Sequence, residues 1–302
     1  MLIRPFNGSR HDAEGLLAVE RQTFAESPYN ADEVIHLFTK AEQRAWLAIV
    51  EGEVTGFVAA FPTYTLHGRN WEVDLVAVQP ASQRQGIATE LIQAAVEGAG
   101  RHSLDRARAV VATDNLASQR AFTKAGFTPE ETVCHLLLYK VRGFAPRPLD
   151  PCPVTVRDLA LSTEEAVAVL WLREGLTLRP ADVLALTSRK ARETLVAVRK
   201  GEVVGFAELL YVETLLYQGI WLESSIAQGA DREIQAALIA EAVERARRKR
   251  LDKVGCLVRT RKRGTAEGAE RDKNVKTLFL REVLVSQGFG VVNEYYIFRR
   301  DF

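Results

Sequence analysis

The stretch VDLVAVQPASQRQGIATELI, residues 73–92, leads from an apolar run through a polar turn into a run with helical spacing. The apolar run breaks at Pro80, and the turn contains Gly86 and Ala88. A strand, a turn and a helix start in this order bring backbone N–H groups and the positive end of a helix to one point, where small residues leave room for an anion. The pattern predicts either a phosphate cradle or a simple strand-to-helix connection.

Two familiar phosphate-binding loops do not fit this turn. A Walker loop ends in Gly-Lys-Ser or Gly-Lys-Thr, and a dinucleotide-binding turn carries three spaced glycines. Residues 79–89 contain neither pattern. The turn is therefore not expected to belong to either class of site.

Composition limits the class of protein. The length of 302 residues favours two domains, each with a core of its own. The hydrophobic content is 47%, yet no stretch reaches the about 20 apolar residues that cross a bilayer. The N-terminal sequence lacks the apolar core and cleavage site of a secretory signal, so we expect a cytoplasmic protein. A net charge of +1 gives no reason to expect nucleic acid or a membrane as partner.

The three cysteines, Cys134, Cys152 and Cys256, are widely spaced along the chain. This spacing indicates neither a disulfide framework nor a zinc site. We expect buried or linker thiols and no metal.

The chain contains an internal duplication. EGEVTGFVAA at residues 51–60 reappears as KGEVVGFAEL at residues 200–209, an offset of 149 residues. Similar segments open and close each half in the same order. Between the halves, residues 142–156 hold four closely spaced prolines, which are typical of an extended linker. We predict a first domain over residues 1–146 and a second over 147–302.

Each half combines hairpin strands with later strands that alternate with helices. In the first half, residues 45–64 form two apolar runs joined by a Glu-Gly turn, which is typical of a hairpin. Residues 71–78 and 106–113 read as further strands, and residues 85–98 and 115–126 as helices. The pattern predicts an α/β (α+β) fold, a mixed sheet with helices on its faces.

At these residues the chain resembles the GNAT superfamily of N-acetyltransferases. Gln83, Gly86 and Ala88 match the family signature of arginine or glutamine, two residues, glycine, one residue, and glycine or alanine. The context of the signature also matches, at Val78, Pro80, Leu91, Ile92, Asn115, Ser118, Lys124, Gly126 and Phe127. The resemblance covers roughly residues 1–143, and the duplication extends it to residues 154–302. It implies two tandem GNAT-type domains.

The resemblance implies that acetyl-CoA binds in the first domain as a cosubstrate, without a metal. Its pyrophosphate would meet the turn and its pantetheine the strand before it, with the thioester carbonyl near the N–H of Val76, which could stabilise an oxyanion. Asn115 and Ser118 would reach the pantetheine arm. The implied cofactor-binding residues are Val76, Val78, Gln83, Arg84, Gln85, Gly86, Ile87, Ala88, Thr89, Asn115 and Ser118.

An amine acceptor is protonated in water, so a base must remove a proton before the nitrogen attacks. Glu72 and Asp74 are the candidate catalytic residues, because they alternate on one face of the strand before the turn. Glu72 also lies where many family members place a glutamate. For each, the simpler interpretation is a solvated carboxylate on a strand face.

The general acid departs from the family pattern. Phe122 stands where the family usually has a tyrosine that protonates the leaving thiolate, and a phenylalanine has no proton to give. Water could suffice, or Tyr64, His135 or Tyr139 could substitute from a neighbouring strand. Each of these three is more often a core or surface residue.

The second half lacks the small residues of the turn. In WLESSIAQGADREIQAALI, residues 221–239, Asp231 and Glu233 stand at the helix start, where carboxylates would repel a pyrophosphate. We expect a degenerate domain that keeps the fold and has lost the cofactor. The basic stretch at residues 244–253 is better explained as a helix C-terminus than as a nucleic-acid site, because acidic residues dilute its charge.

The sequence thus predicts an acetyl-CoA-dependent N-acetyltransferase. The acetyl group would pass to a primary amine of a small molecule or peptide by direct attack in a ternary complex. The alternative is a non-catalytic acyl-CoA-binding or regulatory protein, which Phe122 favours. The sequence does not identify the acceptor, nucleic acid is not expected as a partner, and self-association stays open.

Overall fold

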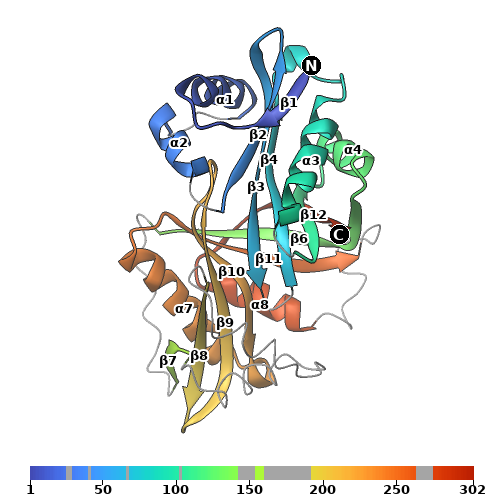
Figure 1. Cartoon of the computed structure of the whole chain (residues 1–302). Helices are drawn as coiled ribbons and strands as arrows, with labels where there is room; N and C mark the ends of the chain where they lie inside the picture. Colours follow the sequence, from blue (N-terminus) through green and yellow to red (C-terminus); the bar gives the residue numbers. More distant parts are fainter. Residues whose placement is uncertain are drawn as a thin grey trace. The chain divides into compact units, whose positions relative to one another are not determined.

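The computed structural model describes residues 1–24, 29–39, 42–65, 68–101, 104–141, 154–159, 192–262 and 275–302. Figure 1 shows the course of the chain. The four linker prolines, Cys152 and the predicted domain boundary at residue 147 lie outside the described residues. That boundary therefore stays a prediction.

The described chain forms two compact units, and neither is a single run of sequence. Unit 1 contains Met1–Glu131, Thr214–Leu216 and Tyr295–Phe302. Unit 2 contains Thr132–Glu213 and Tyr217–Glu294. Each unit therefore includes residues from both halves of the duplication.

Unit 1 is built on a mixed sheet. Its strands follow the order β1-β2-β3-β4-β5-β12, and β4 with β5 is the parallel pair among the antiparallel ones. The strands are β1 (Leu2–Pro5), β2 (Arg44–Val50), β3 (Glu53–Thr65), β4 (Gly68–Val78), β5 (Arg106–Ala112) and the last part of β12 (Gly290–Asp301). The predicted hairpin is confirmed as β2 and β3, whose turn residues Glu51 and Gly52 have φ of 52° and 88°. Two left-handed residues are what a tight hairpin turn requires.

Helices cover both faces of this sheet (Figure 1). They are α1 (Arg10–Thr23), α2 (Ala31–Thr39), α3 (Ile87–Gly98) and α4 (Leu116–Lys124), with short 3-10 turns at Pro80–Ser82 and Ala99–Arg101. Along β3, Phe57 and Ala59 pack with α1 and α2, whereas Val58 and Ala60 pack with α3 and α4. Because successive side chains of a strand point to opposite faces of the sheet, β3 contributes to two apolar clusters. Trp71 of β4 is fully buried, and its Nε1 donates to the Ala95 carbonyl of α3 at 2.8 Å.

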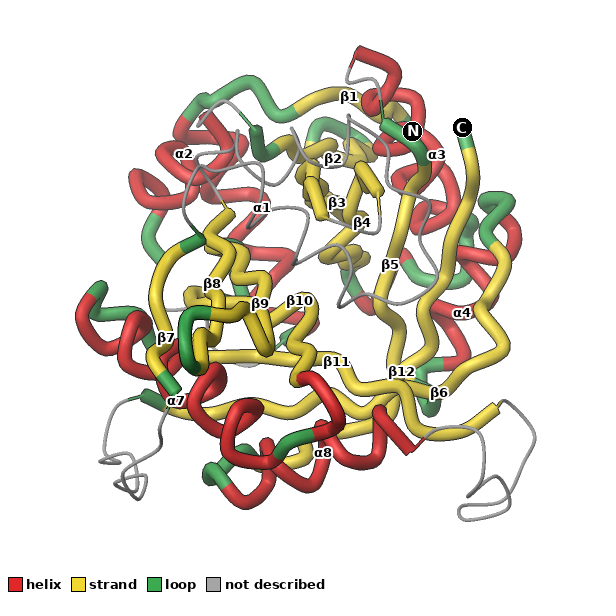
Figure 2. The backbone as a smooth tube through the Cα atoms, turned by 90° about the horizontal axis from the view of Figure 1, so that it is seen from below, coloured by secondary structure: helices red, strands yellow, loops and turns green. Residues whose placement is uncertain are grey.

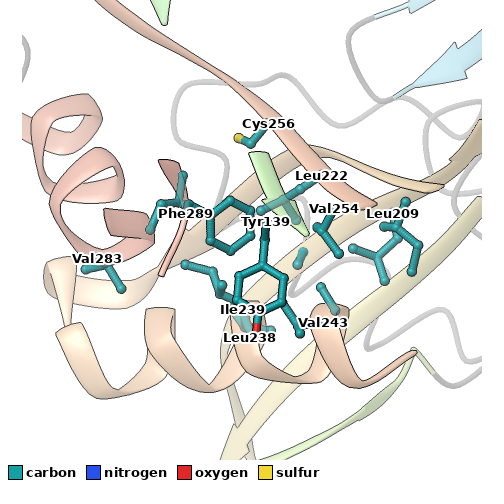
Figure 3. Close-up of a cluster of buried hydrophobic side chains, with 14 of the residues drawn as sticks. Tyr139, Leu209, Leu222, Leu238, Ile239, Val243, Val254, Cys256, Val283 and Phe289 are labelled. Atoms are coloured by element: carbon teal, nitrogen blue, oxygen red, sulfur yellow. The ribbon is translucent and has the colours of Figure 1, made fainter. Parts of the chain in front are cut away.

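Unit 2 repeats this plan. Its strands follow the order β6-β11-β10-β9-β8-β7, with β10 and β11 parallel. They are β6 (Thr128–Lys140), β7 (Thr155–Asp158), β8 (Arg192–Arg199), β9 (Glu202–Glu213), β10 (Gln218–Ala227) and β11 (Lys253–Lys262), with α7 (Arg232–Arg248), α8 (Val275–Ser286) and a 3-10 turn at Gln228–Ala230. Figure 3 shows its apolar core, in which the rings of Tyr139 and Phe289 lie 5.4 Å apart. The predicted α/β fold, sheets with helices on their faces, is confirmed.

The duplication extends to the register of the strands. In unit 1, Ala59 pairs with Leu75 and Ala60 with Val73, so Asp74 lies in a β-bulge. In unit 2, Glu208 pairs with Ser224 and Leu209 with Leu222, so Glu223 lies in a bulge. The offset between these sets is the 149 residues of the sequence repeat. Both halves therefore place a carboxylate in the same distortion of the strand.

The last strands of the two halves are exchanged between the units. The strand that ends the second half completes the sheet of unit 1, and the strand that ends the first half completes the sheet of unit 2. Tyr295–Asp301 of β12 pair with Ala112–Arg106 of β5 in unit 1, and Figure 2 shows the two strands side by side. In unit 2, β6 pairs with β11 from Lys140↔Lys253 to Thr132↔Lys262. The segments that close the two halves of the sequence thus both form strands, and their exchange between the units was not predicted.

Candidate active site

The turn between β4 and α3 has the geometry of an anion cradle. Gly86 is the N-cap of α3, with φ of 87° and ψ of −7°, and no side chain caps this helix start. Arg84 is also left-handed, with φ of 64°. A Cβ built on Gly86 meets nothing within 4 Å, so the space in front of the first helical amides is open. Uncapped amides and the helix dipole together favour a negatively charged ligand.

A cavity of about 490 Å³ opens at this turn. We call it the unit 1 cavity. It is lined by ten of the eleven residues implied to bind acetyl-CoA: Val76, Val78, Gln83, Arg84, Gly86, Ile87, Ala88, Thr89, Asn115 and Ser118. Gln85 does not line it. The side chain of Gln83 donates to the Val78 carbonyl at 3.1 Å, so it also ties the turn to the end of β4.

The charge of the unit 1 cavity suits an anion. Among the described residues that line it, three are basic, Arg84, Arg120 and Lys124, and none carries a carboxylate. Arg120 and Lys124 lie one helical turn apart on α4, which begins at the N-cap Asn115. Sequence reasoning did not assign Arg120 to the site. The signal in the sequence was its spacing of four residues from Lys124, which places two basic side chains on the same face of a helix.

The strand edge beside the cavity has no strand partner over most of its length. Strands β4 and β5 pair at Asn70↔Arg106, Trp71↔Ala107 and Glu72↔Arg108, and the described pairing stops there. On its other side β4 stays paired with β3 as far as Gly56↔Val78. Backbone groups between Val73 and Val78 therefore face a gap in the ladder. An extended ligand with amide groups could hydrogen-bond to such an edge.

Glu72, the first candidate base, lies in a tight polar network. Its side chain accepts from Arg108 Nε at 2.9 Å, from Arg108 Nη2 at 2.8 Å and from Thr63 Oγ1 at 2.5 Å. The residue is only 8% exposed. Its oxygens are thus already occupied by charge-assisted donors. Taking a proton from a substrate would disrupt this network.

Asp74, the second candidate base, has a different environment. The pKa of its carboxyl is raised to about 6: burial and the charge of Glu72 raise it, and a hydrogen bond from Thr214 lowers it. The residue is nevertheless exposed to solvent. Protein atoms surround Asp74 closely enough to weaken its hydration, while an opening to solvent remains. A carboxylate of this kind suits a general base near neutral pH.

The candidate general acids do not gather at the cavity. Phe122 lines it and packs edge-on against Phe127 at 5.1 Å. Tyr139 lies in the core of unit 2 (Figure 3), and His135 of the same unit contacts Glu294 and Arg281. Of the described residues, neither these two nor Tyr64 is among those that line the unit 1 cavity.

The corresponding turn of unit 2 is filled by its own side chain. Asp231 is the N-cap of α7, and its Oδ1 accepts from the amides of Glu233 at 2.9 Å and Ile234 at 3.2 Å. Arg199 donates to the other oxygen at 2.9 Å. The amides that are uncapped at α3 are thus bonded at α7. A pyrophosphate would have to displace this carboxylate.

Among the described residues, no group of three histidine, cysteine, aspartate or glutamate side chains is placed to hold a metal ion. In the same part of the chain, no helix is long and apolar enough to span a membrane. Cys134 and Cys256 are buried free thiols, and burial raises the pKa of the Cys256 thiol.

Residues 14–127 match the model of the acetyltransferase (GNAT) family. The fold is similar to that of a GCN5-related N-acetyltransferase from Sphaerobacter thermophilus, at 18% identity and a TM-score of 0.59, over 99% of this chain and 95% of that one. It is also similar to a tandem GNAT protein from the clavulanic acid biosynthesis pathway, at 15% identity and a TM-score of 0.55, over 99% and 98% of the two chains. No curated protein sequence matches the chain. The family match thus covers residues 14–127, and over nearly its whole length the chain is similar in fold to these two proteins.

Proposed function

We propose that the chain is an acetyl-CoA-dependent N-acetyltransferase whose working site lies in unit 1. The observation that carries the proposal is the unit 1 cavity. It combines the uncapped start of α3 with three basic side chains and no carboxylate, and it extends along the unpaired edge of β4. An anionic ligand with an amide-bearing arm fits these two features together.

In this proposal the pyrophosphate of acetyl-CoA meets the amides that follow Gly86. The pantetheine arm then pairs with the edge of β4 near Val76 and Val78. Asn115 and Ser118 stand at the start of α4, where Asn115 Oδ1 accepts from the Ser118 amide at 3.0 Å. Because that contact uses the side-chain oxygen of Asn115, its side-chain NH2 group is the part that would meet the ligand.

The reaction begins with an ammonium group on the acceptor. Asp74 takes one proton from it, and the free nitrogen attacks the thioester carbon, forming a C–N bond and a tetrahedral intermediate. The oxyanion accepts a hydrogen bond from a backbone N–H of β4 near Val76. The C–S bond then breaks, the coenzyme A thiolate leaves, and the nitrogen loses its second proton to water to give the neutral amide. Since Phe122 has no proton to give, the thiolate is protonated by water.

The roles of the two carboxylates differ in this mechanism. Asp74 is the base, because its raised pKa of about 6 leaves it mostly ionised at neutral pH and still able to accept a proton. Contacts with Arg108 and Thr63 hold the Glu72 carboxylate beside Asp74. That fixed negative charge helps to raise the pKa of Asp74.

The cofactor part of the proposal is tested by calorimetric titration with acetyl-CoA of the full chain and of two variants, Gly86→Asp and Gly86→Asn. Asparagine and aspartate tolerate the left-handed conformation at this position equally well and have nearly the same shape. They differ in charge. We expect Gly86→Asp to bind at least about tenfold more weakly than Gly86→Asn. Equal affinities would remove the cradle from the proposal.

The alternative, a non-catalytic acyl-CoA-binding protein, is favoured by the missing hydroxyl at Phe122. Release of thiol from acetyl-CoA with a panel of small and peptide amines separates the two functions. Turnover that is lost in Asp74→Asn while acetyl-CoA affinity is kept supports the enzyme. Binding without release for every amine supports the alternative.

A further inference from the structure

A short segment between β9 and β10 is anchored in unit 1. Segment 214–216 belongs to that unit, although it lies in the second half of the sequence. Leu215 is 3% exposed and packs in the apolar cluster that contains Leu75 and Ala77 of β4. The hydroxyl of Tyr29 donates to the Thr214 carbonyl at 3.1 Å. The segment is thus fixed by a buried side chain and by a hydrogen bond to its backbone.

This anchoring brings the Thr214 hydroxyl to Asp74. Thr214 is 4% exposed, and its side chain hydrogen-bonds to the Asp74 carboxylate. Asp74 lies in the bulge of β4, between the paired residues Val73 and Leu75. A bulged residue lacks a ladder partner, so its position is less restrained by the sheet. A side-chain partner therefore has an important part in fixing where the carboxylate lies.

We infer that Thr214 is a positioning residue for catalysis, whose hydroxyl holds the Asp74 carboxylate in place for proton transfer. The inference rests on the proposed function of Asp74 as the base. It gives the second half of the chain a part in the reaction that does not require a cofactor of its own. Segment 214–216 supplies the hydrogen bond from Thr214 to Asp74, and this role does not depend on whether α7 can bind a phosphate.

The groups around Asp74 define what the hydroxyl should do. Glu72 of the same strand is the charged side chain whose negative charge raises the pKa of Asp74, and Arg108 of β5 holds Glu72. The Thr214 hydroxyl acts in the opposite direction, because it donates to the ionised carboxylate and so stabilises it. Removing the hydroxyl should therefore raise the pKa of Asp74 and free its side chain to move.

The first test is an NMR titration of the full chain with ¹³C-labelled aspartate, with the Asp74 signal assigned from Asp74→Asn. We expect the titration midpoint of Asp74 to move to higher pH in Thr214→Val and to return in Thr214→Ser, which restores the hydroxyl. Thr39→Val is the matched control, since within the described part of the chain its hydroxyl bonds to carbonyls of its own helix, Ile35 and His36. An unchanged midpoint in Thr214→Val would overturn the contact.

The second test is the pH profile of turnover for the same variants. In Thr214→Val the acidic limb of kcat/KM should move to higher pH with the NMR midpoint. At pH 8, where Asp74 is ionised in both proteins, kcat should still be about tenfold lower because the base is less well placed, with acetyl-CoA affinity unchanged. A purely structural threonine would lower stability and leave the limb in place, which would overturn the inference.

The two proposals fail in distinguishable ways. If the wild-type chain releases no thiol with any amine, the proposed function fails, and the NMR titration still decides whether Thr214 holds Asp74. If the wild-type chain turns over and Thr214→Val has the same limb and the same kcat, only the inference about Thr214 fails.

Discussion

Asp74 has the perturbed environment that a general base needs, and this has consequences for both rate and stability. Replacing it by asparagine keeps the shape and removes the proton acceptor. We expect kcat to fall by about 100- to 10,000-fold, the usual contribution of a positioned base, with little change in acetyl-CoA affinity. Wild-type kcat/KM should fall as the pH drops through about 6, because the carboxyl is then protonated. A profile that stays flat through pH 5 would contradict the assignment.

The raised pKa of Asp74 also predicts a pH-dependent difference in stability between the wild type and Asp74→Asn. The folded-state pKa of Asp74, about 6, lies above the ordinary aspartate value of 3.8. Its contribution to the free energy of unfolding is thus fully present below about pH 4 and is lost as the pH rises through 6. Asp74→Asn should therefore gain thermal stability relative to the wild type between pH 4 and 7. Melting curves at several pH values check this, and a difference independent of pH would count against it.

The variant Glu72→Gln distinguishes the roles of the two carboxylates, Glu72 and Asp74. The change removes the negative charge that raises the pKa of Asp74, so the acidic limb of the activity profile should move to lower pH while turnover persists. It also removes the ion pair between Glu72 and Arg108, which should cost about 3 kcal/mol in free energy of unfolding. Chemical denaturation and pH profiles measure the two effects. Complete loss of turnover in a folded protein would make Glu72 the base instead.

At the level of the elements, two helix starts in corresponding places have opposite chemistry. The amides of α3 follow Gly86 and have no side-chain cap, whereas those of α7 cannot donate to an external ligand without displacing Asp231. We therefore expect about one acetyl-CoA per chain by calorimetry. Asp231→Ala should lower the stability of unit 2 by about 1 kcal/mol through loss of the cap. A second equivalent of bound acetyl-CoA in the wild type would contradict this view of unit 2.

The sequence could predict those features that depend on local chemistry. The hairpin turn at Glu51 and Gly52, the start of α4 at Asn115 and the glycine turn before α3 each follow from the conformational preferences of a few neighbouring residues. The bulge at Asp74 could not be predicted, because it exists only in the register between β4 and β3. The contact from Thr214 was also missed, since it joins positions 140 residues apart in the sequence.

At the scale of the whole molecule, the two halves exchange their last strands, β6 and β12. The closing segments of the two halves are similar in sequence and both form strands, so either one could in principle extend either sheet. Local propensity does not choose between these pairings. In the structure, β12 follows α8 in the chain yet pairs with β5, and β6 follows α4 yet pairs with β11. Each unit therefore contains a strand from the half of the sequence that supplies most of the other unit.

This connectivity predicts how the chain behaves when it is cut. A protease site inserted at residue 147 divides the chain between the halves, so each fragment keeps a strand that completes the other unit. We expect the nicked protein to elute as one species in size-exclusion chromatography and to separate only in denaturant. Residues 1–146 expressed alone should be poorly folded by circular dichroism, because β5 lacks its β12 partner. If that fragment instead folds and binds acetyl-CoA like the full chain, β6 can replace β12 beside β5, and the exchange is not required for the fold.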